Sequence, residues 1–186
     1  MSSRIAPVMV LFVLLAGFAA VVHAEPAVRY GFGRTPAPAT IKALDVAIGP
    51  RGEELPPGSG AVADGAKLFA ERCAMCHGAS GREGPDPVLV GGHGTLTGAE
   101  PLLTIGSYWA YATTLYDYIA RAMPFFAPGS LAPDEIYALC AYLLNANGII
   151  ADDAVMDRVS LPAVEMPNRN GFIPDPRPDT GHAGHP

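Results

Sequence analysis

Basic residues are scarce in this chain, which has 12 Lys and Arg against 18 Asp and Glu and a formal net charge of −6 at pH 7. No stripe or cluster of lysine and arginine side chains runs along the sequence. Binding to nucleic acid is therefore not expected, because nucleic-acid-binding domains concentrate positive charge on one face. The acidic balance favours solubility and docking against a basic face of a partner protein.

Long apolar runs are missing after the first 24 residues. The one such run, Ile5–Val22, follows Arg4 and ends in small residues up to Ala24, which is the pattern of an export signal. We predict that residues 1–24 are a signal peptide cleaved after Ala24 and that the mature protein lies in the periplasm. The run also approaches the length that spans a bilayer, so an uncleaved membrane anchor is the alternative.

Cysteines number only three, so any pairing would leave one over, and a disulfide framework is not expected. Gly and Pro are abundant, with 21 and 19 residues. Segments rich in both flank the middle of the chain. We predict a Pro/Gly-rich N-terminal strap at 25–60, a folded domain at 61–150 and a C-terminal extension with a flexible tail at 151–186. A disordered linker is the alternative for the strap.

Apolar residues in the middle of the chain recur at spacings of three and four, which predicts helices at 62–73, 114–122 and 133–147. Thr113 or Thr114 is expected to cap the second helix. No strand pattern is present, and the glycine-rich segment 78–98 is not expected to be regular. The expected apolar stripes are Gly65, Leu68, Phe69 and Arg72, then Leu115, Tyr118, Ile119 and Ala122, then Ile136, Leu139, Cys140 and Leu143. The sequence therefore predicts an all-α fold.

The most specific motif is Cys-x-x-Cys-His at residues 73–77. Two cysteines three residues apart can add to both vinyl groups of one haem, and the adjoining histidine then lies beneath the iron. We predict one covalent haem c, attached through Cys73 and Cys76, with His77 as an iron ligand.

Two other readings of the cysteine pair are weaker. A zinc site needs four ligands, and only His93 and Cys140 remain inside the domain, at no suitable spacing. A thioredoxin-type pair needs a βαβ setting, which this helical pattern does not offer.

Met123 is the predicted second iron ligand. It follows the second helix and precedes Pro124, which restricts the backbone of the ligand loop. A thioether suits haem iron and raises its reduction potential, although packing in a core is the ordinary role of methionine. His93 is the runner-up ligand and otherwise an exposed loop residue. Cys140, on the apolar stripe of the third helix, is expected to be a buried hydrophobic residue.

Residues 62–148 resemble the class I cytochrome c family. The likeness is carried by the haem motif and by Gly65 and Phe69 of the first helix, which match a close crossing with Leu139 and Tyr142 of the third. The resemblance implies the class I cytochrome c fold around one haem. It also implies His77 and Met123 as the axial ligands.

A narrower resemblance covers most of the mature chain. It is carried by YGFGR at 30–34, LPPGSG at 55–60, GSYWAYATTL at 106–115, RAMPF at 121–125 and MPNRNGF at 166–172. These segments resemble the cytochrome subunit of bacterial sulfur-oxidation (Sox) sulfane dehydrogenases and are similar to cytochromes paired with sulfite dehydrogenases. The resemblance implies a molybdenum-containing dehydrogenase as electron donor. The Sox subunit typically has two haem domains, whereas this sequence contains one haem attachment motif. A related acceptor with a single haem is therefore the alternative.

Three further residues are predicted to bind the cofactor. Tyr108 and Trp109 have polar groups that can bond haem propionates while their rings line the pocket, and simple aromatic packing is the alternative. Arg121, beside Met123, can also meet a propionate or remain a solvated surface residue.

We therefore predict an electron-transfer protein, not an enzyme, which accepts single electrons and passes them to an acceptor such as another cytochrome. One alternative is a carrier for another periplasmic dehydrogenase or a terminal oxidase. Another is a haem enzyme or gas sensor with an open iron site.

Overall fold

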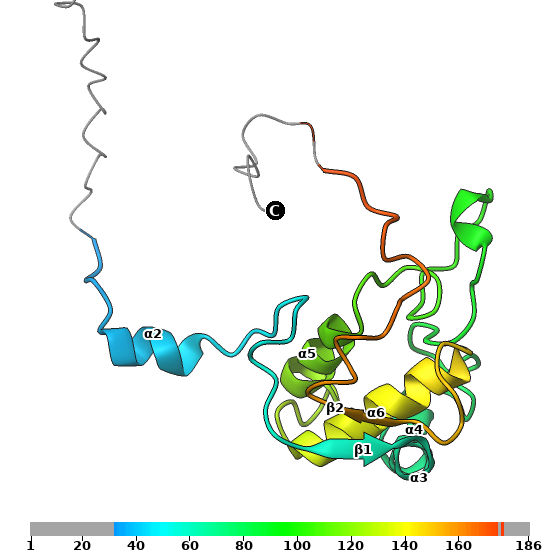
Figure 1. Ribbon diagram of the computed structural model, residues 1–186, viewed down its shortest axis with the longest axis horizontal. Coiled ribbons are helices and arrows are strands. Elements are labelled where there is room, and N and C mark those ends of the chain that lie inside the picture. Colours follow the sequence, from blue (N-terminus) through cyan, green and yellow to red (C-terminus); the bar gives the residue numbers. More distant parts are fainter. Residues whose placement is uncertain (1–31, 175, 177–186) are drawn as a thin grey trace, which may run out of the picture. The chain divides into compact units, whose positions relative to one another are not determined.

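The structure is a computed structural model that describes residues 32–174 and 176 (Figure 1). The predicted signal peptide at 1–24 lies outside the described residues. The chain divides into two units between Ile41 and Lys42. The short helix α2 (Pro38–Leu44) has no buried residue. Within the described part of the chain, no helix is both long and apolar enough to cross a membrane.

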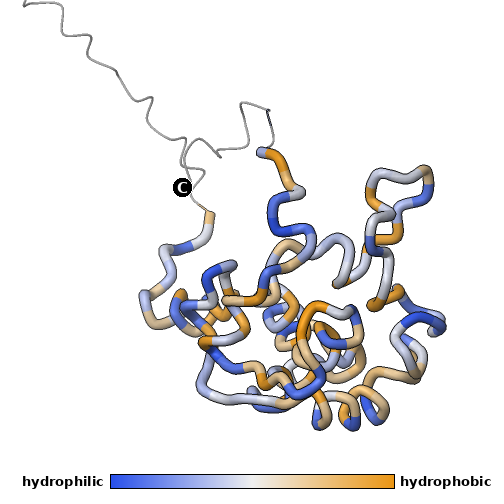
Figure 2. The backbone as a smooth tube through the Cα atoms, turned by 45° about the vertical axis from the view of Figure 1, so that its right-hand side comes forward, coloured by the Kyte–Doolittle hydropathy of each residue, from blue (hydrophilic) through white to orange (hydrophobic). Residues whose placement is uncertain are grey.

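The second unit is built from helices, as expected. The main helices are α3 (Val62–Arg72), α5 (Ala112–Ala122) and α6 (Pro133–Ala146), with the single turn α4 (Ala74–His77) after α3. A 3-10 turn, η1 (Thr95–Thr97), is the regular element inside the glycine-rich segment 78–98, where none was expected. Figure 2 shows apolar stretches recurring between hydrophilic ones along the coiled segments, as expected for helices that bury one face.

The crossing of α3 and α6 is the centre of the unit. Gly65 of α3 is buried, and the ring of Phe69 lies 5.0 Å from the ring of Tyr142 in α6. Leu139 is 1% exposed at the same crossing. The four residues that carried the resemblance to class I cytochromes therefore meet as expected. The predicted stripe of α6 is also buried along its whole length.

Helix α6 begins with two acidic residues in its first turn, as its sequence indicated. Ala132 at the N-cap has no side-chain acceptor, and Glu135 supplies the missing partner, because its Oε2 accepts the Ala132 N–H at 2.7 Å. Gly148 follows the C-cap residue Asn147 with a φ of +70°, a conformation that glycine adopts without strain.

Two short strands correct the prediction that the chain has none. β1 (Ser59–Ala61) pairs antiparallel with β2 (Val155–Asp157), with Gly60 opposite Met156. Three-residue strands are too short to show an alternating pattern. A β carbon on Gly60 would lie 2.1 Å from the Ala138 nitrogen, so the position of β1 depends on its close approach to α6.

Helix α5 starts two residues earlier than predicted, and the predicted threonine caps are wrong. The N-cap residue is Tyr111, without a side-chain cap. Thr113 is instead buried inside the helix, and its hydroxyl donates to the Pro50 carbonyl at 3.1 Å.

The predicted buried face of α5 is also wrong at one position. Tyr118, predicted to be buried, is 47% exposed, whereas Tyr116 is 2% exposed. The ring of Tyr116 packs against Tyr137 of α6, 4.7 Å away.

Residues 48–56 run against α5 and α6. The Ile48 N–H donates to Asp117 Oδ1 at 2.9 Å, and the Tyr137 hydroxyl donates to the Pro56 carbonyl at 2.8 Å. Leu55 is 4% exposed within the core. These contacts attach this stretch of the leader to the helical unit.

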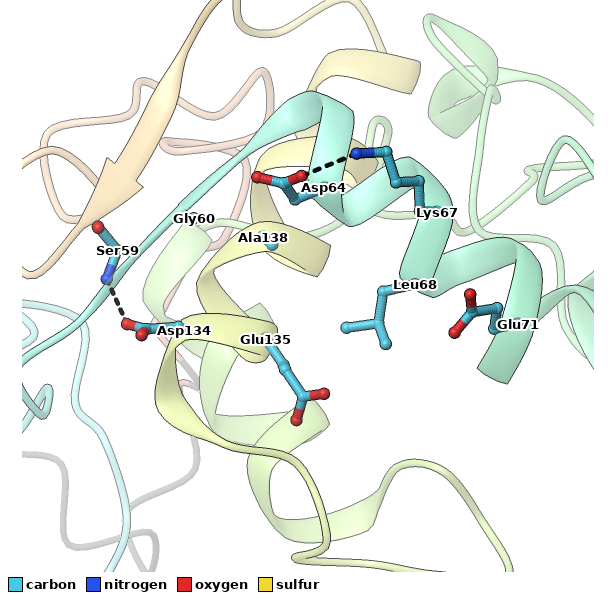
Figure 3. A pocket seen from close by; sticks show the side chains of 9 residues that line it. All are labelled: Ser59, Gly60, Asp64, Lys67, Leu68, Glu71, Asp134, Glu135 and Ala138. Atoms are coloured by element: carbon cyan, nitrogen blue, oxygen red, sulfur yellow. Dashed lines mark hydrogen bonds and ion pairs between the residues drawn. The ribbon is translucent and has the colours of Figure 1, made fainter.

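A surface pocket with an excess of acidic side chains lies where β1, α3 and the start of α6 meet (Figure 3). Lys67 pairs with Asp64 at 3.2 Å, and Asp134 accepts the Ser59 N–H at 2.8 Å. Glu71 and Glu135 also line it, so carboxylates outnumber the single base among its residues. This surface carries part of the acidic charge of the chain.

Candidate haem-binding site

The Cys-x-x-Cys-His motif continues the helical path of α3 by one more turn. The Cys73 N–H donates to Phe69 O at 2.9 Å, and the Cys73 carbonyl in turn accepts the N–H groups of Cys76 and His77 at 3.1 and 3.0 Å. Side chains three residues apart on a helical turn lie on the same side. Gly78, with a φ of +80°, ends the turn. The two thiols therefore come from one turn with the histidine directly after them.

The imidazole of His77 is held by a backbone carbonyl. Its Nδ1 lies 2.9 Å from the Pro87 oxygen. A carbonyl can only accept, so Nδ1 carries the proton and Nε2 keeps a free lone pair. This is the arrangement in which a histidine binds a metal through Nε2 while a second group fixes its ring.

The loop after the motif folds back onto it. The Asp86 N–H donates to the Cys76 carbonyl at 3.0 Å. A β carbon on Gly84 would lie 1.9 Å from the same oxygen, so no larger residue fits there without displacing the backbone. This return places the Pro87 carbonyl beside the His77 ring.

The two motif cysteines form no disulfide, and the pKa of each thiol is raised. Burial raises the pKa of Cys73 to about 11. A hydrogen bond with Asp86 and burial raise the pKa of Cys76. The described residues contain no group of three or more His, Cys, Asp or Glu side chains placed to hold a metal ion. The motif therefore fits thioether attachment of a haem better than a zinc site, which needs four ligands.

Met123 is the C-cap residue of α5, and its N–H donates to Ile119 O at 3.1 Å. Its side chain is partly buried against the core. Met156 and Met166 are fully inside the core at 5% and 3% exposed, and Met75 is 81% exposed. Met123 is therefore the partly buried methionine at a helix end, and its role as iron ligand stays a prediction.

The aromatic block before α5, which consists of Tyr108, Trp109 and Tyr111, contacts the C-terminal segment. The sequence did not indicate this contact. The Tyr108 carbonyl accepts the Asn168 side-chain N–H at 2.7 Å, and the Tyr108 ring lies edge-on to Phe172 at 5.2 Å. The Arg169 guanidinium lies 4.5 Å from the centre of the Tyr111 ring. These contacts fix the block over its length.

Trp109 belongs to the same block and lies edge-on to Tyr118 of α5, with ring centres 5.8 Å apart. It also packs, partly buried, against the core. This contact explains why Tyr118 is directed away from the buried stripe that was predicted for α5.

Arg121 forms an ion pair with Asp117, one turn earlier in α5, which neither of its predicted roles included. Asp117 Oδ1 accepts from Arg121 Nε at 3.0 Å and from the Ile48 N–H at 2.9 Å. Burial by itself would raise the pKa of Asp117, but the hydrogen bonds from Arg121 and Ile48 outweigh it and hold the pKa below its usual value. The hydrogen bond to Asp117 in turn raises the pKa of Arg121.

His93 and Cys140, the two remaining candidates, have the simpler of the roles predicted for them, an exposed loop residue and a buried core residue. His93 is exposed, and its Nε2 lies over Gly106, where a β carbon would come within 2.5 Å. Cys140 is 0% exposed in the core, and burial raises the pKa of its thiol far above the usual value. The observed role of Cys140 is packing.

Two residues of the site were missed by the sequence analysis. Pro87 acts through its carbonyl oxygen, which every residue has, so no residue type signals it. Asn147 was seen only as the end of a helix, yet its buried side chain bonds the loop after the motif at Leu89 and Gly91. The one available signal was the place of this polar residue at the end of the predicted helix, before Gly148.

A mostly helical unit that presents a Cys-x-x-Cys-His turn, with the histidine ring fixed for coordination, defines a haem-binding electron-transfer domain. The sequence profile of the family described as Cytochrome c matches residues 62–147. The crystal structure of the sulfane dehydrogenase SoxCD from Paracoccus pantotrophus contains a similar chain, with 44% sequence identity and a TM-score of 0.72. That match covers 85% of this chain and 80% of the other. No curated protein sequence matches.

The chain therefore belongs to the cytochrome c family and has the class I cytochrome c fold. Its cofactor is covalently attached haem c, with iron at its centre, and its role is that of a haem electron carrier. The resemblance to the cytochrome of sulfane dehydrogenase, read from the sequence, is confirmed by the match.

Proposed function

We propose that this protein is a periplasmic cytochrome with a single haem that takes single electrons from a molybdenum-containing sulfite or sulfane dehydrogenase subunit. The observation that carries the proposal is the 44% identity to a chain of sulfane dehydrogenase SoxCD over 85% of this chain. The electrons then pass to an acceptor such as another cytochrome. The signal peptide at 1–24 and the domain boundaries at 25–60, 61–150 and 151–186 belong to the same proposal.

Cys73 and Cys76 hold the haem as thioethers, and His77 and Met123 bind its iron in this proposal. The bound haem supplies a centre that gains and loses one electron. Support comes from the His77 ring, because the Pro87 carbonyl leaves Nε2 free to coordinate. Further support is the place of Met123 at the end of α5, where it is only partly buried.

Tyr108, Trp109 and Arg121 complete the proposed cofactor-binding set. Trp109 packs on α5, the helix that ends at Met123, and the Tyr108 backbone is fixed by Asn168. Arg121 has five N–H donors in its guanidinium. Asp117 takes hydrogen bonds from Nε and one terminal nitrogen, Nη2, so Nη1 is left for a propionate. The ion pair with Asp117 then orients the arginine toward that bond.

The first experiment identifies the electron donor. Holoprotein immobilised from a periplasmic extract is expected to retain a partner that contains molybdenum, measured by elemental analysis. The isolated partner is expected to reduce the haem when sulfite or a sulfane sulfur compound is added, and not without it. A reproducible partner that lacks molybdenum contradicts the proposal and favours another dehydrogenase or a terminal oxidase.

A second experiment separates the carrier from a haem enzyme or gas sensor. The optical spectrum of the reduced protein is recorded before and after carbon monoxide is added. An unchanged spectrum is expected, because an iron with two protein ligands has no open position. A shifted haem band would show an accessible iron and would favour the enzyme or sensor role over the carrier role.

A third experiment tests the location. Mass spectrometry of the protein purified from periplasm is expected to give a mature N-terminus at Glu25, together with the mass of one haem. A chain that keeps residues 1–24 and remains with the membrane contradicts cleavage and supports the anchored alternative.

A further inference from the structure

The side chain of Asn147 connects the end of α6 to the loop that follows the haem motif. It is 6% exposed, and its Oδ1 accepts the Gly91 N–H at 2.9 Å. Its Nδ2 donates to the Leu89 carbonyl at 3.2 Å and to the Leu143 carbonyl at 2.8 Å. An amide side chain offers about four hydrogen-bonding sites, so three of them are used here. The amide joins two parts of the chain that are 56 and 58 residues apart.

The segment that Asn147 holds includes Pro87, whose carbonyl fixes the His77 ring. Before Pro87, the Asp86 N–H bonds to the Cys76 carbonyl at 3.0 Å. After it, the Leu89 carbonyl also accepts the Ile105 N–H at 3.3 Å. Proline has no N–H of its own, so its backbone cannot be fixed by donating. The Leu89 N–H also donates to the Gly81 carbonyl at 2.9 Å. The position of the Pro87 carbonyl is therefore set by these backbone neighbours together with Asn147, which is the buried side chain among them.

The conformation of Asn147 is itself fixed by packing. A β carbon on Gly106 would lie 2.3 Å from Asn147 Oδ1, so the backbone of the 104–106 loop rests directly on the amide. Gly91 has a φ of +107°, a conformation that favours glycine, where its N–H bonds to the amide oxygen. The amide, the loop and the helix end thus form one packed unit.

We infer that Asn147 is a positioning residue for His77. It holds residues 86–91 so that the Pro87 carbonyl accepts the Nδ1 proton, and in this way it sets how strongly the imidazole donates to the iron. This inference rests on the proposed role of His77 as an iron ligand. A hydrogen bond at Nδ1 makes the imidazole a more basic ligand. A stronger donor stabilises ferric iron more than ferrous iron, so loosening this bond raises the reduction potential.

Two substitutions test the inference in the holoprotein. Asn147→Leu keeps the branched shape of the side chain and removes all three hydrogen bonds. Asn147→Asp keeps an acceptor for the Gly91 N–H but sets a carboxylate oxygen against the Leu89 carbonyl. Asn147→Leu is expected to raise the reduction potential while the haem content stays the same. Asn147→Asp adds a negative charge that by itself lowers the potential, so this variant is judged by proton exchange alone. The His77 Nδ1 proton is expected to exchange with solvent about tenfold faster or more, the factor for loss of a buried hydrogen bond.

Asn145→Leu is the matched control. Asn145 lies two residues away in the same helix, and its Nδ2 donates to the Ile150 carbonyl at 3.1 Å and to Asp152 Oδ1 at 2.9 Å. Neither bond reaches the 86–91 segment. This variant is expected to lower the stability of the protein and to leave the reduction potential and the His77 exchange rate unchanged.

Asn147 variants that lose stability but keep the wild-type potential and exchange rate overturn the inference, since Asn147 is then only a helix cap. A measurement on the wild type is independent of their folding. In its NMR spectrum the His77 Nδ1 proton and the Gly91 N–H are expected to show similar protection factors, which are exchange rates corrected for the intrinsic rate of each group, because one opening exposes both. A far smaller protection factor for the His77 proton overturns the inference. In the ferric protein, a His77 ring without any paramagnetic shift removes instead the proposed iron ligand, which separates the two failures.

Discussion

Gly65 of α3 lies so close to the Ala138 carbonyl of α6 that a β carbon would stand 1.9 Å from that oxygen. The same β carbon would lie 2.8 Å from the Tyr142 Cβ. Both neighbours belong to a helix backbone or are attached directly to it, so neither can move aside cheaply. The helix crossing at the centre of the fold therefore requires glycine at this position.

Gly65→Ala is expected to lower the free energy of unfolding by about 3 kcal/mol or more, because the helices must separate to admit the methyl group. Urea unfolding of the holoprotein measures the change. Ala70→Gly, at an exposed position of the same helix, is the control and is expected to cost about 1 kcal/mol from helix propensity alone. A Gly65→Ala protein as stable as the control would show that the crossing can open without cost.

Met123→Ala is expected to lower the reduction potential and to let carbon monoxide bind the ferrous iron. A bound thioether raises the potential and fills the second axial position, and this variant removes it. Met166→Ala is the matched control, since Met166 also precedes a proline but is 3% exposed in the core. It is expected to cost about 2–4 kcal/mol of stability and to keep the wild-type potential. An unchanged potential in Met123→Ala together with a lowered potential in Met166→Ala would show that Met123 is not the iron ligand.

Cys73→Ala and Cys76→Ala are each expected to leave the haem attached by one thioether, and the double variant is expected to lose all covalent haem. Extraction with acidified acetone followed by mass spectrometry of the chain measures attachment. Cys140→Ala is the control, because this thiol is 0% exposed within the core. It is expected to keep the haem fully attached and to lose about 1 kcal/mol of stability from packing. Covalent haem on the double variant would disprove the attachment sites.

Asp117→Asn is expected to destabilise the protein by about 1–2 kcal/mol at neutral pH, since it removes a charge-assisted bond to Arg121. The pKa of Asp117 is lowered in the folded state, so its contribution is present above the unfolded pKa of about 3.9 and is lost as the pH falls through the folded pKa. The difference in unfolding free energy between wild type and variant should therefore shrink below about pH 4. Urea unfolding at several pH values measures it.

Glu53→Gln is the control for that pH series. Glu53 pairs with Arg51, but their side chains are 64% and 79% exposed. Ion pairs on the surface are screened by solvent, so a smaller effect is expected at every pH. An Asp117→Asn protein with the same pH dependence as wild type would mean that the Asp117–Arg121 pair contributes nothing to stability.

The periodic helices were predictable from local patterns. The apolar spacing in α6 matches its buried face at all four predicted positions, and α3 matches its predicted start at Val62. The stripe of α5 failed at Tyr118, because Tyr116 and not Tyr118 packs on α6, while Tyr118 lies against Trp109. A single sequence does not show which neighbours a helix will have.

The site shows the same division. The sequence identified the Cys-x-x-Cys-His turn because its chemistry depends on neighbouring residues within five positions. It did not show that the Pro87 carbonyl bonds His77, that Asn147 holds the loop, or that Arg121 pairs with Asp117. A carbonyl has no side-chain signature, and an arginine can pair with any acid in reach.

The helices, the expected haem attachment and the family resemblance could all be predicted from residues close together in the chain, since each depends on local spacing. The β1–β2 pair, the Asn147 contacts and the bond between Asn168 and the Tyr108 carbonyl across 60 residues appear only in the folded chain. Such contacts form between backbone groups and side chains brought together by the packing of α3 on α6. Their partners are defined only once that packing exists.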